Sequence, residues 1–233
     1  MTTISTSPPS SANDAVAERL HSVRLRIEQA GGDPSAIRVV AVTKGFGPDA
    51  VLAALDAGLS DIGENYANEL VAKAAELGDE TSTPSPVRWH FLGAIQRNKV
   101  ARLAPVVGMW QSVSRVEEGE RIARYAPGAA VLVEVETTGL SGRNGCPPDG
   151  VRALVPRLLD TGLDVRGLMT VAAPGPESAS AAFATVRSLA DELELEERSM
   201  GMTDDLEAAV AAGTTMVRIG RALFGERPAR RPA

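Results

Sequence analysis

Lysine is scarce in this chain, and one of its lysines stands where an amine could do chemistry. Of 24 basic residues only Lys44, Lys73 and Lys99 are lysines. A coding bias toward arginine accounts for most of this scarcity, but a lysine amine can lose its proton and attack a carbonyl, which a guanidinium cannot do. Lys44 follows an apolar run in VVAVTKGFG, which predicts a position at a strand end. There desolvation would lower its pKa and prepare it to form an imine; the alternative is an exposed surface lysine.

Two later segments have the composition of a phosphate site. In TTMVRIGRALFG, Gly220 joins an apolar strand to a helix, and the N–H groups that begin such a helix favour an anion. In RSMGMTDDLEAA, Ser199 supplies a hydroxyl, Gly201 permits close approach of a ligand, and Thr203 is predicted to be a helix N-cap. Either segment alone is common in proteins without a ligand. Together, at neighbouring strand ends, they predict a phosphate cup.

Three other residues each have a functional and a structural interpretation. Arg218 lies inside the last predicted strand, where it could face a heteroaromatic nitrogen or form a buried salt bridge with Glu134 or Glu136. Asn65 follows the second strand and could hydrogen-bond a ring hydroxyl or cap a helix. His90 is alone in its strand, and such a histidine is more often a hydrogen-bonded core residue than a catalyst.

The elements that must position these residues alternate along the chain. Each predicted strand precedes a predicted helix, and parallel βαβ units have this order. Eight such units fit a single-domain (β/α)8 TIM barrel of the α/β class, whose strand ends meet at one functional face. The rival is an open doubly wound sheet, but no strand opens a G-x-G-x-x-G turn into a helix. Strands are expected at residues 37–43, 61–63, 88–92, 109–113, 130–136, 165–171, 198–202 and 215–219, and the helices between them at 48–57, 65–77, 98–103, 115–125, 148–159, 178–195 and 204–211.

Composition excludes several classes of function. The chain has 233 residues and a net charge of −6, which gives no electrostatic footprint for nucleic acid. No apolar run is long enough for a membrane helix, and we find no secretory signal. One cysteine and two histidines exclude a structural zinc site of the usual type, and the lone cysteine indicates a reducing, cytoplasmic compartment.

The same composition suggests three regions. Residues 1–12 are rich in Ser, Thr and Pro and are expected to form a disordered tail. Residues 13–227 are expected to form the barrel, and residues 228–233 a short basic tail. Because a closed barrel has no free sheet edge, we expect a monomer.

An imine-forming lysine, a phosphate cup and a ring-facing arginine together indicate pyridoxal 5'-phosphate (PLP). The segments AVTKGFG, DIGENYANEL, WHFLGAIQRNK, RGLMT and SMGMTDDLEAAVAAGTTMVRIGRALFG also resemble the PLP homeostasis protein family, over nearly all of residues 38–225. The resemblance implies a single-domain version of the alanine racemase N-terminal barrel. It further implies that PLP is held as a Schiff base on Lys44, with its phosphate on Ser199, Gly201, Gly220 and the N–H of Arg221, its pyridine nitrogen facing Arg218 and its ring near Asn65.

Three functions could use such a site: a PLP carrier, a racemase-like enzyme, or an aldolase-type barrel. The aldolase lysine usually sits on a later strand than the one before Lys44. Racemisation needs an acid/base group on each face of the substrate carbon, and racemases take the second from a tyrosine of another domain. The chain ends soon after Gly225, so we expect no such domain, and its only tyrosines are Tyr66 and Tyr125.

Arg218 also bears on this choice. A guanidinium does not give up a proton to the ring nitrogen, which leaves the ring a weaker electron sink. We therefore expect a protein that is not an enzyme but binds PLP and supplies or buffers it, with apo PLP-dependent enzymes as recipients.

Overall fold

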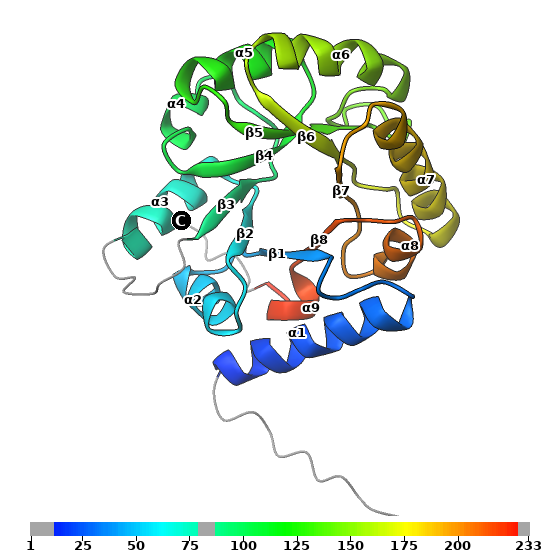
Figure 1. Ribbon diagram of the computed structural model, residues 1–233. Helices are drawn as coiled ribbons and strands as arrows, with labels where there is room; N and C mark the ends of the chain where they lie inside the picture. Colours follow the sequence, from blue (N-terminus) through cyan, green and yellow to red (C-terminus); the bar gives the residue numbers. More distant parts are fainter. Residues whose placement is uncertain (1–11, 79–86, 228–233) are drawn as a thin grey trace, which may run out of the picture.

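A computed structural model of the chain describes residues 12–78 and 87–227. Its strands form one closed parallel barrel in sequential order, seen end-on in Figure 1. The barrel closes where the first and last strands pair, from Arg38 opposite Met216 to Ala41 opposite Ile219. This closure confirms the predicted (β/α)8 barrel and excludes the open doubly wound sheet. The strands are β1 (Arg38–Val42), β2 (Asp61–Glu64), β3 (Arg88–Phe91), β4 (Val107–Val113), β5 (Ala130–Glu134), β6 (Asp164–Met169), β7 (Glu197–Ser199) and β8 (Met216–Ile219).

Helices surround the barrel, as the predicted alternation requires. They are α1 (Ala12–Gln29), α2 (Pro48–Asp56), α3 (Ala67–Gly78), α4 (Val100–Leu103), α5 (Val116–Tyr125), α6 (Pro148–Asp160), α7 (Pro176–Glu192), α8 (Leu206–Ala211) and α9 (Arg221–Phe224). Helix α1 lies along the outside of the ring against α2, α8 and α9. None of the helices in the described part of the chain combines the length and the apolar character needed to cross a membrane.

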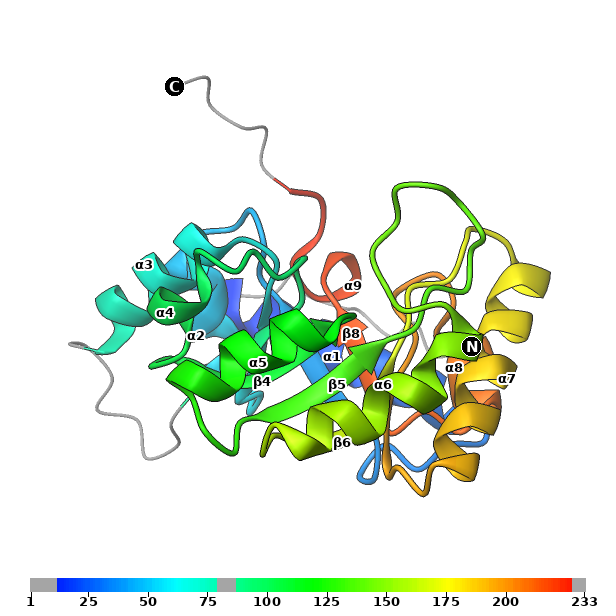
Figure 2. The same cartoon turned by 90° about the horizontal axis from the view of Figure 1, so that it is seen from above.

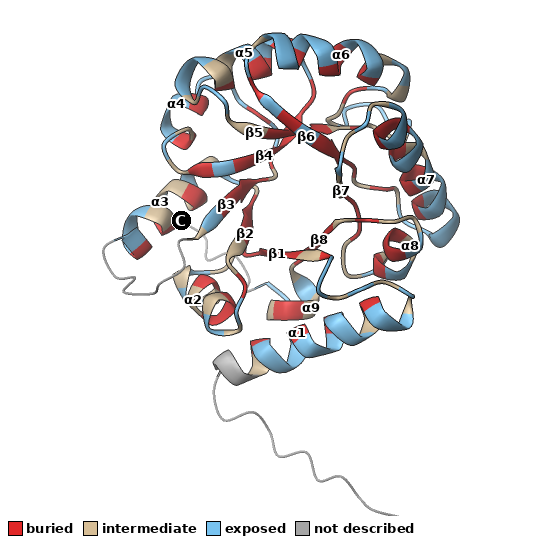
Figure 3. Ribbon diagram, in the orientation of Figure 1, coloured by how far each residue is buried: buried red, intermediate tan, exposed pale blue. Residues whose placement is uncertain are grey.

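Two apolar layers hold the barrel together. The larger layer fills the space between strands and helices, and it takes apolar residues of every strand except β7, such as Val39 and Ala41 of β1. The smaller layer fills the barrel interior. In Figure 3 the buried residues accordingly line the strands and the inner faces of the helices. The inner layer consists of Val40, Met109, Leu132, Met169 and Met216.

Most element boundaries differ from the sequence prediction by a few residues, and three of these differences concern the mouth of the barrel. Helix α3 begins at Ala67, so Asn65 belongs to the loop ahead of it. Strand β7 ends at Ser199, which leaves the next residues in a loop that reaches the barrel mouth. Strand β5 ends at Glu134, and Figure 2 shows the loop after it projecting from the same side as the segment that follows α9.

The predicted tails lie outside the described residues, apart from Ala12, where α1 begins. Their predicted boundaries therefore stay predictions.

Candidate functional site

Lys44 lies two residues beyond the end of β1, at the mouth of the barrel. Its side chain is half-buried and lines a cavity of about 290 Å³. Burial lowers the pKa of the Lys44 amine, and the nearby positive charges of Arg227 and Arg218 lower it further. A larger fraction of the amine is then unprotonated near neutral pH than in an exposed lysine, as nucleophilic attack requires.

The cavity gathers residues from the carboxyl ends of several strands and from the loops that follow them. This is the face at which TIM barrels carry their functional sites. Four of the lining side chains carry a positive charge: Lys44, Arg218, Arg221 and Arg227. The whole lining consists of Val42, Lys44, Asn65, Leu92, Met169, Val171, Met202, Thr203, Asp204, Arg218, Gly220, Arg221 and Arg227.

The segment after β8 forms one side of this cavity. Gly220 separates β8 from α9, and a Cβ atom there would lie 3.2 Å from the carbonyl oxygen of Val42. Thr203 comes from the neighbouring loop, and its hydroxyl accepts a hydrogen bond from the Ala222 N–H at 3.3 Å. Because that contact uses the oxygen, the Thr203 hydroxyl hydrogen is left to donate elsewhere. Arg221 forms an ion pair with Asp204 at the same rim.

Arg218 is fixed inside the barrel with its side chain reaching the cavity floor. It is 5% exposed, and burial lowers the pKa of its guanidinium to about 10. Its Nη1 donates to the carbonyl oxygen of Ser199 at 2.7 Å and to the Ser199 hydroxyl at 2.8 Å, and its Nη2 donates to the carbonyl oxygen of Thr170 at 2.7 Å.

The salt bridge considered for Arg218 is not formed within the described part of the chain. Asn144 donates a hydrogen bond to the Glu134 carboxylate instead, and burial raises the pKa of Glu134. The Glu136 carboxylate accepts hydrogen bonds from Thr138 and Gly139. Arg218 is therefore held by neutral oxygen atoms, which leaves its positive charge free to act on a ligand.

Ser199 and Gly201 are not placed at the cavity, contrary to expectation. Ser199 is fully buried inside the barrel and donates to the side-chain oxygen of Gln111 at 2.7 Å. Gly201 has a positive φ of 94°, and a Cβ there would lie 2.5 Å from that of Ala209 in α8. These two residues support the loop from beneath, whereas Thr203, predicted only as an N-cap, lines the cavity.

Asn65 lines the cavity from the side of β2. Its Oδ1 atom is buried without a hydrogen-bond partner in the described structure. Since α3 begins two residues later, Asn65 is not placed to cap that helix. Asn65 also lines a second, smaller cavity of about 190 Å³ together with Tyr66, Asn68 and Lys99. Asn65 therefore lies between the two cavities, and its Oδ1 atom is a hydrogen-bond acceptor that no described residue uses.

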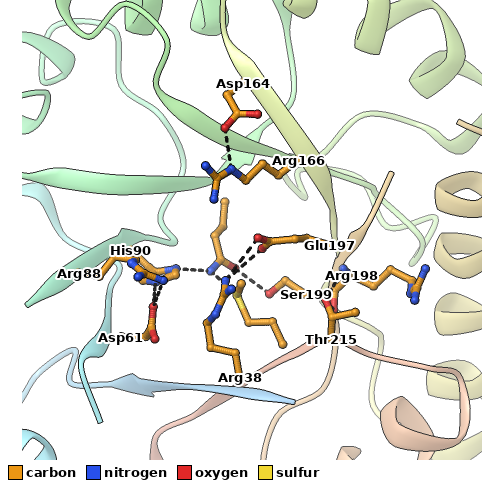
Figure 4. Close-up of polar contacts among 12 residues, drawn as sticks. Arg38, Asp61, Arg88, His90, Asp164, Arg166, Glu197, Arg198, Ser199 and Thr215 are labelled. Carbon is orange, nitrogen blue, oxygen red and sulfur yellow. Dashed lines mark hydrogen bonds and ion pairs between the residues drawn. The ribbon is translucent and has the colours of Figure 1, made fainter. Parts of the chain in front are cut away.

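His90 is a hydrogen-bonded core residue, as its structural interpretation predicts. It is fully buried in β3, with Nε2 lying 2.8 Å from a carboxylate oxygen of Asp61 and Nδ1 lying 2.7 Å from the amide nitrogen of Gln111. Asp61 is the first residue of β2, so this contact lies at the end of the barrel opposite to the cavity. Figure 4 shows it near the charged residues Arg38, Arg88 and Glu197. His90 does not line the cavity.

Sequence reasoning missed Thr203 as a lining residue and Arg227 altogether. The sequence did indicate Thr203, because this hydroxyl residue directly follows SMGM, in the unit that precedes the strand carrying Arg218. Arg227 gave no signal, since it follows the last helix, next to the predicted basic tail.

The lining fits a phosphorylated aldehyde that carries a ring nitrogen. Lys44 supplies the amine for an imine, Gly220 allows a ligand close to the backbone, and Thr203 and Arg221 can contact an anion. Arg218 offers a fixed positive charge, and the unpartnered Asn65 Oδ1 can accept from a hydroxyl. In the described residues no cluster of histidine, cysteine and carboxylate side chains is arranged to hold a metal ion.

Comparison with known proteins agrees with this geometry. Residues 13–228 match the family model of the alanine racemase N-terminal domain. A pyridoxal phosphate homeostasis protein of Pseudomonas aeruginosa is 39% identical over 231 residues, which is 94% of this chain and 98% of that protein. Another, from Deinococcus radiodurans, is 37% identical over 88% of this chain and 97% of that protein.

Solved structures of several proteins are also similar to this chain. The structure of PipY from Synechococcus elongatus with PLP bound has a TM-score of 0.78 and 34% identity, and it covers 90% of this chain and 100% of that one. A protein of unknown function from Bifidobacterium adolescentis has a TM-score of 0.83 and 30% identity, and it covers 94% of this chain and 98% of that one. A dehydratase from Delftia is 19% identical with a TM-score of 0.64, which shows likeness of fold alone.

Proposed function

Because this chain belongs to the pyridoxal phosphate homeostasis proteins, a family built on the alanine racemase N-terminal domain, we propose that it binds PLP on Lys44 and supplies or buffers the cofactor. The observation that carries the proposal is the position of the Lys44 amine, half-buried and with a lowered pKa, beside a cavity whose other charged groups suit a phosphate. PLP supplies an aldehyde that forms a Schiff base with a lysine amine, with loss of one water molecule.

The described residues allow each part of the cofactor to be assigned a partner. Gly220, the N–H of Arg221 and the Thr203 hydroxyl hold the phosphate, and Arg218 faces the ring nitrogen. Asn65 accepts from the ring hydroxyl through Oδ1. The expected contributions of Ser199 and Gly201 become indirect, because Ser199 holds Arg218 and Gly201 lets the loop pack against α8.

We propose a carrier rather than a racemase because the cavity offers one suitable acid/base group where racemisation needs two. Lys44 can serve one face of a substrate carbon. Of the two tyrosines in the chain, Tyr66 lines the neighbouring cavity and Tyr125 lies on α5 against Arg121 and Arg124. Asp204 is engaged by Arg221.

Apo forms of PLP-dependent enzymes are the recipients we propose, and the cytoplasm is the compartment. The single cysteine, Cys146, supports the second point because it offers no internal disulfide. We propose a monomer because the closed barrel leaves no sheet edge for pairing.

Two assays on the PLP-loaded protein test this function. In the first, a cofactor-free aminotransferase is added and its activity is followed; the proposal expects activity to recover. In the second, L-alanine and other L-amino acids are incubated with the protein and D-isomer is measured. Turnover of any of these amino acids in the ordinary enzyme range, about 1–10³ per second, would contradict the carrier proposal and show that the protein is a racemase.

A further inference from the structure

Five polar side chains from five different strands form a continuous chain of hydrogen bonds through the barrel interior. Nη1 of Arg218 lies 2.8 Å from Oγ of Ser199, which lies 2.7 Å from Oε1 of Gln111. Nε2 of Gln111 lies 2.7 Å from Nδ1 of His90, and Nε2 of His90 lies 2.8 Å from Oδ1 of Asp61. The chain thus connects Arg218 at the cavity floor with Asp61, the first residue of β2, at the opposite end of the barrel. Figure 4 labels Ser199, His90 and Asp61 along it.

When His90 is neutral, its surroundings fix the direction of every hydrogen bond in this chain. The Asp61 carboxylate can only accept, so the His90 Nε2 carries a hydrogen and the neutral ring presents a lone pair at Nδ1. The Gln111 amide nitrogen donates to that lone pair, and it also donates to the Met216 sulfur at 3.0 Å. Beside a neutral ring, a flipped Gln111 would place its oxygen against the Met216 sulfur and leave the Asp61 carboxylate facing a ring nitrogen without hydrogen.

This direction continues to the guanidinium. With its amide oxygen facing Ser199, Gln111 accepts the Ser199 hydroxyl hydrogen, so the Ser199 oxygen presents its lone pairs to Arg218. Two contacts of Nη1 and one of Nη2 then hold the guanidinium from below. The Nε–H and one N–H of Nη2 have no partner recorded in the described structure, and Arg218 lines the cavity.

We propose that His90 and Gln111 are positioning residues for Arg218: their one-way chain of hydrogen bonds keeps the Ser199 hydroxyl as an acceptor and so orients the guanidinium toward the cofactor ring. This inference rests on the proposed function, since the ring in question is that of PLP. A chain whose donors and acceptors are all used also resists rearrangement, because reversing one member would leave buried partners unpaired.

The first test needs no cofactor. Nitrogen NMR of the apo protein reports which ring nitrogen of each histidine carries hydrogen, and the sequence has only His90 and the exposed His21. A His21→Asn variant assigns the two signals. We expect His90 to be neutral with hydrogen on Nε2. Hydrogen on Nδ1 would reverse the direction of the chain and overturn the proposal, whether or not the protein binds PLP.

The second test changes the middle of the chain. Gln111→Leu removes the connection, and Met109→Leu, an interior substitution on the same strand, is the control of similar volume. We expect Gln111→Leu to raise the Kd for PLP about threefold to tenfold and to move the pH at which the bound cofactor's visible spectrum changes. The control should do neither. If the two variants have equal affinities for PLP and equal spectral midpoints, the hydrogen-bonded residues serve only to pack the core, which would contradict the proposal.

Gln111→Glu keeps the test decisive if the leucine variant does not fold. A carboxylate at this position can only accept, so His90 must then carry hydrogen on both ring nitrogens to satisfy its two neighbours. We expect NMR to show the doubly protonated ring and the spectral midpoint to move. Carbon NMR reports whether the introduced carboxyl is ionised; an unprotonated Nδ1 beside an ionised carboxylate at position 111 would contradict the proposed coupling. Lack of PLP binding by the unaltered protein would overturn the proposed function instead. The NMR experiment on the apo protein tests the direction of the hydrogen bonds independently of that result.

Discussion

The ammonium of Lys73 lies 2.5 Å from the carboxylate of Glu64, and it also donates to the carbonyl oxygen of Thr43 at 2.8 Å. Thr43 immediately precedes Lys44, and its hydroxyl donates to the same Glu64 oxygen at 2.7 Å. Lys73 and Glu64 are both buried between the barrel and α3. This ion pair therefore fixes the backbone turn that presents Lys44.

Substituting Lys73 with methionine should destabilise the protein by about 3–5 kcal/mol, because it leaves the buried Glu64 carboxylate without its positive partner. Chemical denaturation measures the loss. The double variant Lys73→Met with Glu64→Leu should recover most of it, since replacing a whole buried pair by apolar groups is often neutral. A single variant as stable as the unaltered protein would show that the pair is unimportant for folding.

The same variant should show a pH dependence of definite sign. Burial raises the pKa of Glu64 even with Lys73 present, and without Lys73 the neutral carboxyl is favoured still more. A group whose pKa is higher in the folded than in the unfolded state contributes stability at low pH and loses it as pH rises. The stability difference between Lys73→Met and the unaltered protein should therefore shrink from about pH 8 to about pH 5. A constant difference would contradict this.

Thr203 and Ser199 should respond differently to loss of their hydroxyls. Thr203 lines the cavity, so Thr203→Val should weaken PLP binding about tenfold, as expected for one lost hydrogen bond to a charged acceptor. Ser199 is fully buried beneath the cavity, so Ser199→Ala should act mainly on stability and on the orientation of Arg218. Titration with PLP and thermal unfolding separate the two effects. A larger loss of affinity in Ser199→Ala than in Thr203→Val would favour the prediction from sequence that Ser199 itself contacts the phosphate.

Arg227 should contribute, after burial, to the pH dependence of cofactor attachment. Its positive charge lowers the pKa of Lys44, so removing it raises that pKa and keeps the amine protonated to higher pH. In Arg227→Met the rate at which the visible absorption of bound PLP develops should reach half its maximum at a higher pH than in the unaltered protein. The control is Arg152→Met, whose arginine pairs with Glu192 far from the cavity. An unchanged midpoint in Arg227→Met would mean that burial alone sets the reactivity of Lys44.

The fold could be predicted from sequence because strand and helix patterns alternate without interruption. All eight predicted strands are present, and their ends bring Lys44, Gly220 and Arg218 to one cavity. The side chains of β7 could not be assigned to the cavity or the interior, because that depends on the residue at which the strand ends. Ending β7 at Ser199 turns this hydroxyl inward and gives the rim position to Thr203.

Long-range partners were also beyond sequence reasoning. The contact between Gln111 and Ser199 joins residues 88 positions apart in the chain, and nothing local to either one indicates the other. The scarcity of lysine drew attention to Lys44 and equally to Lys73, but only the structure separates the amine at the cavity from the amine in the buried ion pair.

The most direct test of the central claim is to find which residue carries the cofactor. The protein is incubated with PLP, reduced with borohydride so that any imine becomes a stable amine, and digested for peptide mass analysis. The account predicts a single modified residue, Lys44, and no incorporation into a Lys44→Arg variant. Modification of Lys73 or Lys99 in place of Lys44, or none in the unaltered protein, would contradict it.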